Sequence, residues 1–144
     1  MRTILLIALL FTTTIYGQQK ERIKALKTEH ISNALKLTTT EAQKFWPIYS
    51  AHEDKMLALR QKERREIFTI VKGDVEGLSD AEANTLIEKG INFKTTELQY
   101  YKELVANLKG VIPPYKILKL RRAEEEFKRK LLERLKKRRE QRKN

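Results

Sequence analysis

The placement of glycine and proline divides this sequence into four long segments. Only Gly90 and Pro47 fall inside a segment. All the others lie at segment boundaries: Gly17, Gly73, Gly77, Gly110, Pro113 and Pro114. No stretch shows the alternation of apolar and polar residues that is typical of a strand. The sequence therefore predicts an all-α fold with helices near residues 20–36, 39–72, 79–109 and 113–140.

Apolar residues recur every three or four positions in these segments, which is the period of one helix face. The predicted stripe of residues 39–72 contains Ala42, Phe45, Tyr49, His52, Met56, Leu59, Ile67, Ile70 and Val71. That of residues 79–109 contains Leu86, Ile87, Gly90, Leu98, Tyr101, Val105 and Leu108. A short turn joins these two segments, so we expect an antiparallel hairpin. A helix over residues 39–72 is about 50 Å long. This predicts an elongated, curved four-helix hairpin whose stripe is incompletely covered in a monomer.

Two of the predicted helices begin with the same capping motif. Thr38 is followed three residues later by Glu41, and Ser79 is followed three residues later by Glu82. In such a capping box the hydroxyl accepts a hydrogen bond from the backbone N–H of the residue three positions later. The carboxylate in turn accepts one from the backbone N–H of the first residue. Both positions are therefore predicted helix N-termini.

An aromatic group stands directly behind the first cap, at Phe45, Trp46 and Tyr49, and it encloses Pro47. Proline about two turns into a helix removes the hydrogen bond to the carbonyl of Gln43 and predicts a kink. Two interpretations remain open. The kink shapes a concave face, or it is a tolerated feature of the packing around Trp46.

The N-terminus has the layout of a secretory signal peptide. Arg2 supplies a positive charge, residues 4–11 are wholly apolar, and residues 12–17 are small and polar and end at Gly17. The apolar run is shorter than the roughly 20 residues that span a bilayer as a helix. We therefore expect residues 1–17 to be cleaved near Gly17 and residues 18–144 to form a single all-α domain in the periplasm. An uncleaved membrane anchor is the alternative.

The Leu-Thr opening, in a small exported basic helical chain, resembles the Leu-Thr-x-x-Gln motif of the Spy/CpxP-like periplasmic proteins. The residues that carry the resemblance are Leu37, Thr38, Glu41, Phe45, Trp46, Pro47, Tyr49, Leu78, Ser79 and Glu82. The longer motif from Leu37 to Tyr49 resembles that of the family branch described as sensors of ECF-type sigma factors. Glu41 stands where the Leu-Thr-x-x-Gln motif has Gln.

This resemblance implies an antiparallel, cradle-like homodimer. It further implies a non-enzymatic envelope-stress sensor that regulates an ECF sigma-factor pathway by binding a protein partner. An ATP-independent periplasmic chaperone for misfolded exported proteins, a Spy-like holdase, is the alternative function.

The residue inventory argues against catalysis. The chain has no cysteine and only two histidines, and it lacks a phosphate-binding glycine loop. Ser50 and His52 are two residues apart on a helix and so point to different faces. We therefore expect no enzyme and no cofactor. His52 and Met56 share a helix face and His30 lies on another helix, but this set is too small to predict a metal site.

The charge balance bears on the choice of partner. The chain has 31 Lys and Arg against 19 Asp and Glu, a net charge of +12. In an exported chain this favours acidic polypeptides or an anionic membrane surface over nucleic acid.

On the second helix, cationic and apolar side chains are mixed, and we expect them to bind a partner or unfolded clients: Lys55, Met56, Leu59, Arg60, Arg64 and Arg65. An ordinary solvated face is the alternative. Residues 136–144 are predicted to be a basic, frayed end that can attract anionic lipid.

Overall fold

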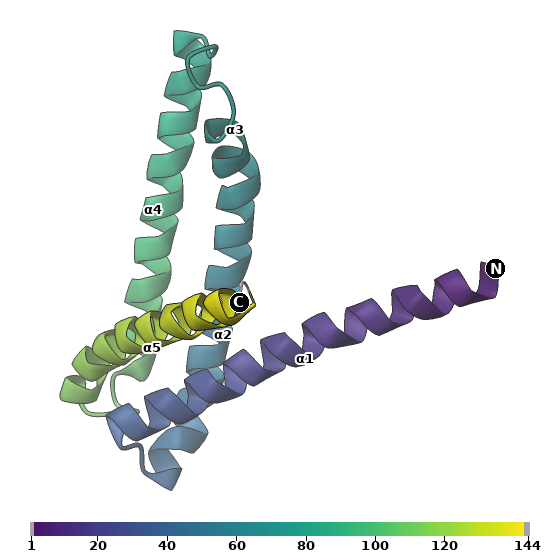
Figure 1. Ribbon diagram of the computed structural model, residues 1–144. Helices are drawn as coiled ribbons and strands as arrows, with labels where there is room; N and C mark the ends of the chain where they lie inside the picture. Colours follow the sequence, from purple (N-terminus) through teal and green to yellow (C-terminus); the bar gives the residue numbers. More distant parts are fainter. Residues whose placement is uncertain (1, 143–144) are drawn as a thin grey trace. The chain divides into compact units, whose positions relative to one another are not determined.

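The computed structural model describes the backbone of residues 2–142 and the side chains of residues 18, 19 and 21–142. Within these limits the chain forms helices and turns without a strand, which confirms the predicted all-α class. The helices are α1 (Arg2–Leu35), α2 (Thr39–Glu63), η1 (Arg64–Phe68), α3 (Thr69–Val71), α4 (Asp80–Leu108) and α5 (Pro114–Gln141) (Figure 1). They group into two compact units, residues 39–114 and the two segments 1–38 and 115–144. The sequence had predicted a single domain after residue 17.

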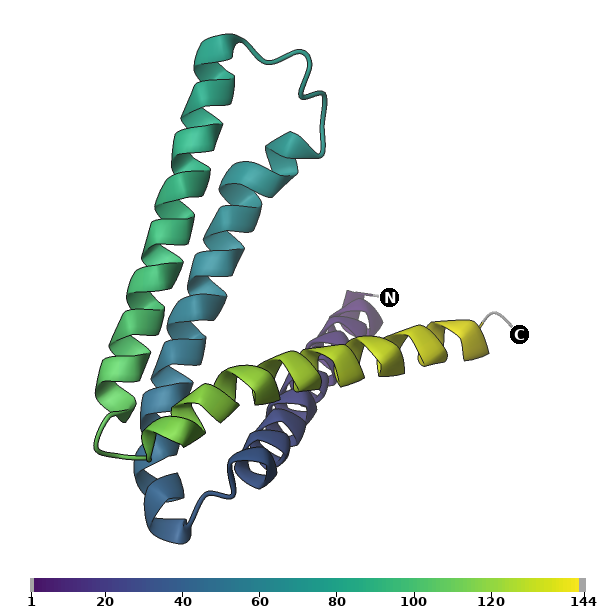
Figure 2. The same cartoon turned by 90° about the vertical axis from the view of Figure 1, so that its left-hand side faces the viewer.

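Residues 39–114 form an antiparallel helical hairpin, as predicted. α2, η1 and α3 form one arm, and α4 returns along it as the other (Figures 1 and 2). The turn between the arms is closed by local hydrogen bonds. The N–H of Gly73 donates to the carbonyl of Ile70 at 2.9 Å, and the N–H of Gly77 donates to Asp74 Oδ1 at 3.2 Å.

The predicted capping box at the start of α4 is confirmed. The Ser79 hydroxyl accepts from the backbone N–H of Glu82 at 3.3 Å, and Glu82 Oε2 accepts from the backbone N–H of Ser79 at 2.9 Å. Together these bonds satisfy two amide groups that a helix start leaves unpaired. At the other predicted cap, α2 begins at Thr39, directly after Thr38.

The prediction that the first helix begins near residue 20 is wrong, because α1 begins at Arg2 and includes Gly17. Leucine, isoleucine and alanine of a signal-like segment are themselves acceptable in a helix, and one internal glycine costs only about 1 kcal/mol. At the other end of the chain, α5 is helical through Gln141. Most of the end that we expected to be frayed is therefore helical, and residues 143–144 lie outside the described part.

The prediction of one uniform helix over residues 39–72 is also wrong. After Glu63 the chain makes the π-helical turn η1 before α3 begins. The hydroxyl of Thr69 donates to the carbonyl of Arg64, five residues earlier, at 3.0 Å. A π turn holds more residues than an α turn, so it rotates the side chains that follow it. Ile70 and Val71 consequently leave the stripe of α2 and are exposed.

The hairpin buries one face of each arm. The buried side chains are Phe45, Tyr49 and Met56 on α2, and Phe93, Leu104 and Leu108 on α4. The predicted stripe of the second arm is therefore wrong in part, because Ile87, Leu98 and Tyr101 are exposed. α4 carries two apolar faces, which the sequence pattern had merged into one, and the hairpin covers only one of them.

In the unit that contains α1 and α5, the two helices contact each other through polar and aromatic groups. His30 Nε2 lies 3.1 Å from the carbonyl oxygen of Ala123, and the His30 ring packs against Phe127 with centroids 5.8 Å apart. The buried Lys116 donates from Nζ to the carbonyl of Lys36 at 2.8 Å.

The C-terminus of α1 closes without glycine. Lys36 has a left-handed φ of 49°. Its N–H donates to the carbonyl of Asn33, and the N–H of Leu37 donates to the carbonyl of Ser32. These two bonds form a Schellman motif, whose left-handed position is usually glycine.

Candidate functional site

The motif residues of α2 form a packed aromatic cluster. The Phe45 and Tyr49 rings stack with centroids 5.3 Å apart, and Trp46 contacts both edge-on at 5.0 and 5.7 Å. Phe45 is 0% exposed and Tyr49 is 3% exposed. Phe45 and Tyr49 are therefore core residues and do not offer a contact surface, whereas Trp46 is half-buried. Pro47 lies inside α2 and is itself exposed.

The second motif is at the other end of the hairpin. Leu78, Ser79 and Glu82 lie at the start of α4, and the arms are antiparallel, so this motif is at the opposite end of the hairpin from the start of α2 (Figure 2). The structure therefore does not join the two motifs into one site. Each of them begins a helix.

One face of α4 is apolar and exposed. We call the four side chains that form it the α4 stripe: Ile87, Ile91, Leu98 and Tyr101, with exposed fractions of 59%, 53%, 52% and 41%. Lys94 completes a spacing of four, three, four and three residues. This is the heptad spacing of helices that pack along a straight seam. The stripe is about 20 Å long at 1.5 Å per residue.

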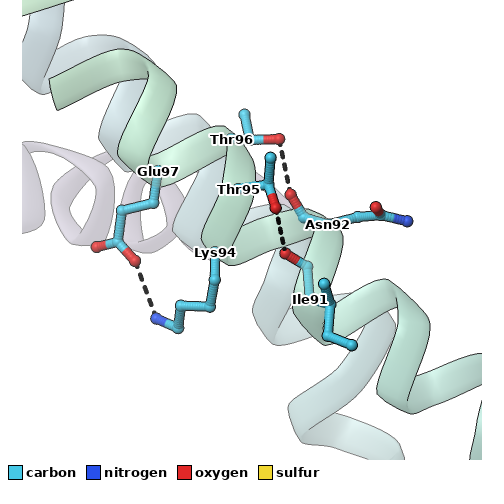
Figure 3. A network of polar contacts seen from close by, with 6 residues as sticks. All are labelled: Ile91, Asn92, Lys94, Thr95, Thr96 and Glu97. Carbon is cyan, nitrogen blue, oxygen red and sulfur yellow. Dashed lines mark hydrogen bonds and ion pairs between the residues drawn. The ribbon is translucent and has the colours of Figure 1, made fainter. Parts of the chain in front are cut away.

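An ion pair between Lys94 and Glu97 lies at the middle of the α4 stripe (Figure 3). Lys94 Nζ lies 2.9 Å from Glu97 Oε2, while the hydroxyls of Thr95 and Thr96 donate to backbone carbonyls four residues earlier. The hydrogen bond to Glu97, and then its charge, raise the pKa of Lys94. The charges of Glu63 and Arg60 on α2 also act on Lys94. The flank of α2 that carries Arg60 therefore adjoins the stripe.

A groove of about 540 Å³ lies between α2 and α4 on the other flank of the hairpin. We call it the cationic groove and define it by three lysines with three apolar or aromatic side chains: Lys55, Lys62, Lys89, Leu59, Phe93 and Tyr100. Leu98 and Tyr100 are two residues apart on α4 and so lie on different faces. The groove and the α4 stripe are separate surfaces.

Carboxylates neutralise part of the groove's charge. Lys55 Nζ lies 2.9 Å from Glu103 Oε2 and 5.4 Å from the centroid of the Tyr100 ring. This hydrogen bond raises the pKa of Lys55 and lowers that of Glu103. Glu66, which belongs to η1, lies 3.9 Å from both Lys62 and Lys89.

The six predicted partner-binding residues do not form one surface. Met56 is buried in the hairpin, so it packs inside and is not a contact residue in this structure. Lys55 and Leu59 line the cationic groove. Arg60, Arg64 and Arg65 are exposed and do not line the groove. A helix period of 3.6 residues separates side chains that are neighbours in the sequence.

The signal that locates the α4 stripe is present in the sequence, as the seven-residue spacing from Ile87 through Tyr101. The predicted stripe of residues 79–109 places Ile87, Leu98 and Tyr101 in the core and does not include Ile91 or Lys94. The cationic groove is different. Lys62, Lys89 and Phe93 come from two helices, and no pattern within either helix joins them.

The described residues contain neither a metal-binding cluster nor a membrane-spanning helix. No three His, Cys, Asp or Glu side chains there cluster closely enough to hold a metal ion. His52 lines an open pocket of about 340 Å³ together with Pro47, Tyr100 and Glu103. No helix of the described part has a stretch long and apolar enough to cross a membrane.

Comparisons of this chain with models of known protein families, with curated proteins and with solved structures find no match.

Proposed function

We propose that this protein works by binding other polypeptides and performs no catalysis. The α4 stripe is the observation that supports this proposal. Four large apolar side chains lie exposed in a row along one helix face, with Lys94 among them and Arg60 beside them. Contiguous apolar patches on a soluble surface mark contacts with other molecules more often than isolated exposed residues do.

A second copy of the chain is the first partner that fits the stripe. Heptad spacing requires a helix with the same spacing opposite it, and α4 of another copy supplies one. In an antiparallel pair, the exposed Glu88 of one copy would face the exposed Lys102 of the other beside the apolar seam. This is the antiparallel homodimer that the resemblance to the Spy/CpxP-like proteins implies.

The oligomeric state tests this partner. Light scattering after size exclusion is expected to give a dimer for the protein and a monomer for Leu98→Lys. The matched control is Leu118→Lys on α5, since Leu118 is 77% exposed and lies outside the stripe. This control should remain dimeric, and circular dichroism should show both variants helical. A wild-type protein that stays monomeric at high concentration would refute the dimer.

Within this binding role, we propose a periplasmic envelope-stress sensor that regulates an ECF sigma-factor pathway through a protein partner. The support is the motif around Thr38 and Tyr49 together with the signal-like segment that ends at Gly17. Mass spectrometry of the exported protein should find Gln18 at its N-terminus. Deletion of the gene should change the transcription of envelope-stress genes, and unchanged transcription under all stresses tested would contradict the sensor.

The alternative is an ATP-independent holdase for misfolded exported proteins. Exposed apolar side chains at the end of the first arm (Phe68, Ile70 and Val71) and the nearby Arg64 and Arg65 favour it. Such surfaces suit transient contact with unfolded acidic chains. The protein should suppress light scattering by an aggregating acidic client, and charge reversal at Arg60, Arg64 and Arg65 should weaken that effect. No suppression at an equimolar ratio of dimer to client would rule the holdase out.

The basic end of α5 gives a further proposed contact, with an anionic membrane surface. Arg138 and Arg139 lie in its last turn. Sedimentation with vesicles that contain anionic lipid should be salt-dependent and should weaken when residues 136–144 are removed. Salt-independent sedimentation would argue against this contact.

A further inference from the structure

The cationic groove carries more lysines than carboxylates, and it is separate from the α4 stripe. Three lysines line it together with a single carboxylate, Glu66. Glu103, which pairs with Lys55, adds one carboxylate beside it. The lysines still outnumber these carboxylates, so the groove favours an anionic ligand.

The contacts of Glu66 with the lysines are loose. It lies 3.9 Å from both Lys62 and Lys89, whereas a charge-assisted N–H···O hydrogen bond is about 2.7–2.9 Å long. All three side chains are substantially exposed, so Glu66 can turn to solvent. A ligand carboxylate that reaches hydrogen-bond distance from both lysines therefore makes shorter contacts than Glu66 does.

The lining of the groove is partly apolar. Leu59, Ala58, the buried Phe93 and the Tyr100 ring contribute apolar surface, and Asn92 and Thr96 contribute polar groups. Lysine side chains add their apolar stems to such a surface while keeping the ammonium groups in water. From Lys89 to Tyr100 the groove follows α4 for about 16 Å at 1.5 Å per residue.

The end of the groove is built by an irregular helix. Glu66 lies within the π-helical turn Arg64–Phe68, and single π turns occur frequently at functional sites. This observation is independent of the charges, and it marks the same place.

We propose that the cationic groove binds a single-chain fatty acid of about 12 carbons, whose extended length at ordinary carbon–carbon bond lengths matches the groove. The acyl chain lies on Leu59 and Phe93, and the carboxylate replaces Glu66 between Lys62 and Lys89. The volume of about 540 Å³ falls within the range of roughly 300–1,000 Å³ that is typical of small-molecule sites.

Titration calorimetry on the full-length protein, with dodecanoate below its micelle concentration, tests this proposal. Saturable binding of one dodecanoate per chain is expected. Acetate and dodecyltrimethylammonium should bind at least about tenfold more weakly, which corresponds to a loss of about 1.4 kcal/mol. The first lacks the chain and the second has the opposite charge. No saturable heat with dodecanoate, or equal binding of the cationic amphiphile, would overturn the proposal.

Two variants separate the head group from the chain. Lys62→Gln with Lys89→Gln should weaken dodecanoate about tenfold or more, because each lysine loses a charge-assisted hydrogen bond. The matched control is Lys119→Gln with Lys128→Gln, which removes two exposed lysines of α5 outside both the groove and the α4 stripe. Ala58→Phe keeps every charge but places a large ring in the groove from an exposed position, so it should also weaken dodecanoate binding while circular dichroism stays unchanged.

The results also identify the head group and distinguish this site from the binding role proposed above. Equal loss in the lysine variant and its control would show a non-specific charge effect and overturn the site. Binding of dodecyl phosphate without binding of dodecanoate would overturn the carboxylate assignment. Leu98→Lys, which tests the α4 stripe, should leave dodecanoate affinity unchanged, so the two proposals can fail independently.

Discussion

Phe45 and Phe68 provide a matched test of how the hairpin is stabilised. Both lie on the first arm, but Phe45 is 0% exposed and Phe68 is 55% exposed. Burying a phenylalanine side chain stabilises a protein by about 1.5–3 kcal/mol, and each aromatic pair adds about 0.5–1.5 kcal/mol. Phe45 makes two such pairs, with Trp46 and Tyr49. Phe45→Ala should therefore lower the free energy of unfolding by about 3–5 kcal/mol, in line with other buried aromatic truncations.

Phe68→Ala removes the same atoms from a side chain that is less than half buried. Its expected cost is about 1 kcal/mol, because only the buried part of the transfer free energy is lost. Urea unfolding of both variants should be followed by circular dichroism and by the fluorescence of Trp46, the single tryptophan of the chain. Equal destabilisation by the two substitutions would refute the assignment of Phe45 to the core and of Phe68 to the surface.

Four further predictions concern helix ends. Ser79→Ala should lower the free energy of unfolding by about 1 kcal/mol in urea titrations through loss of the cap, and an unchanged midpoint would contradict the capping box. Hydrogen bonds from the side chain and then the backbone of Ser79 lower the pKa of Glu82 in the folded protein. The ionised Glu82 therefore stabilises the fold fully above its pKa in the unfolded chain. This stabilisation is lost as the pH falls through its lower pKa in the folded protein. Hydrogen-exchange protection of the first turn of α4 should therefore fall as the pH drops below the unfolded pKa of glutamate, and less so in Ser79→Ala. The same pH response in both proteins would count against this cause. Lys36→Gly should raise the free energy of unfolding by about 1 kcal/mol by relieving a left-handed conformation, whereas Lys116→Met should lower it by about 1–3 kcal/mol by leaving the carbonyl of Lys36 without this donor. Thermal unfolding that shifts both variants in the same direction would contradict this description of the end of α1.

The separate faces of the hairpin make the proposed activities physically independent. The α4 stripe and the cationic groove occupy different sides of α4, and the core residues Leu104 and Leu108 lie on a third. A substitution on one face therefore changes one activity without removing the others. This separation makes single-site variants informative for this protein.

Much of the fold follows from local patterns along the chain. Boundary residues such as Gly73 and Pro114, and the capping pair Ser79 and Glu82, place the turns and the start of α4 near their observed positions. Backbone hydrogen bonding in helices involves residues close in sequence, and capping involves residues only three apart. The helix class and the bounds of α4 and α5 were therefore accessible from the sequence alone, whereas the start of α1 and the π turn after Glu63 were not.

The choice between apolar faces needed the tertiary structure. Ile87 and Phe93 are both large and apolar, and both lie on α4, yet Phe93 is buried and Ile87 is exposed. Periodicity reveals that a helix has apolar faces, but it does not say which of them another helix covers. The π turn at Arg64–Phe68 adds a rotation that the spacing of three and four residues does not predict.

The cationic groove likewise exists only because packing brings Lys62 and Lys89, 27 positions apart in the chain, beside the same carboxylate. Burial and charge proximity depend on contacts between distant residues, and those contacts are set by how the helices pack.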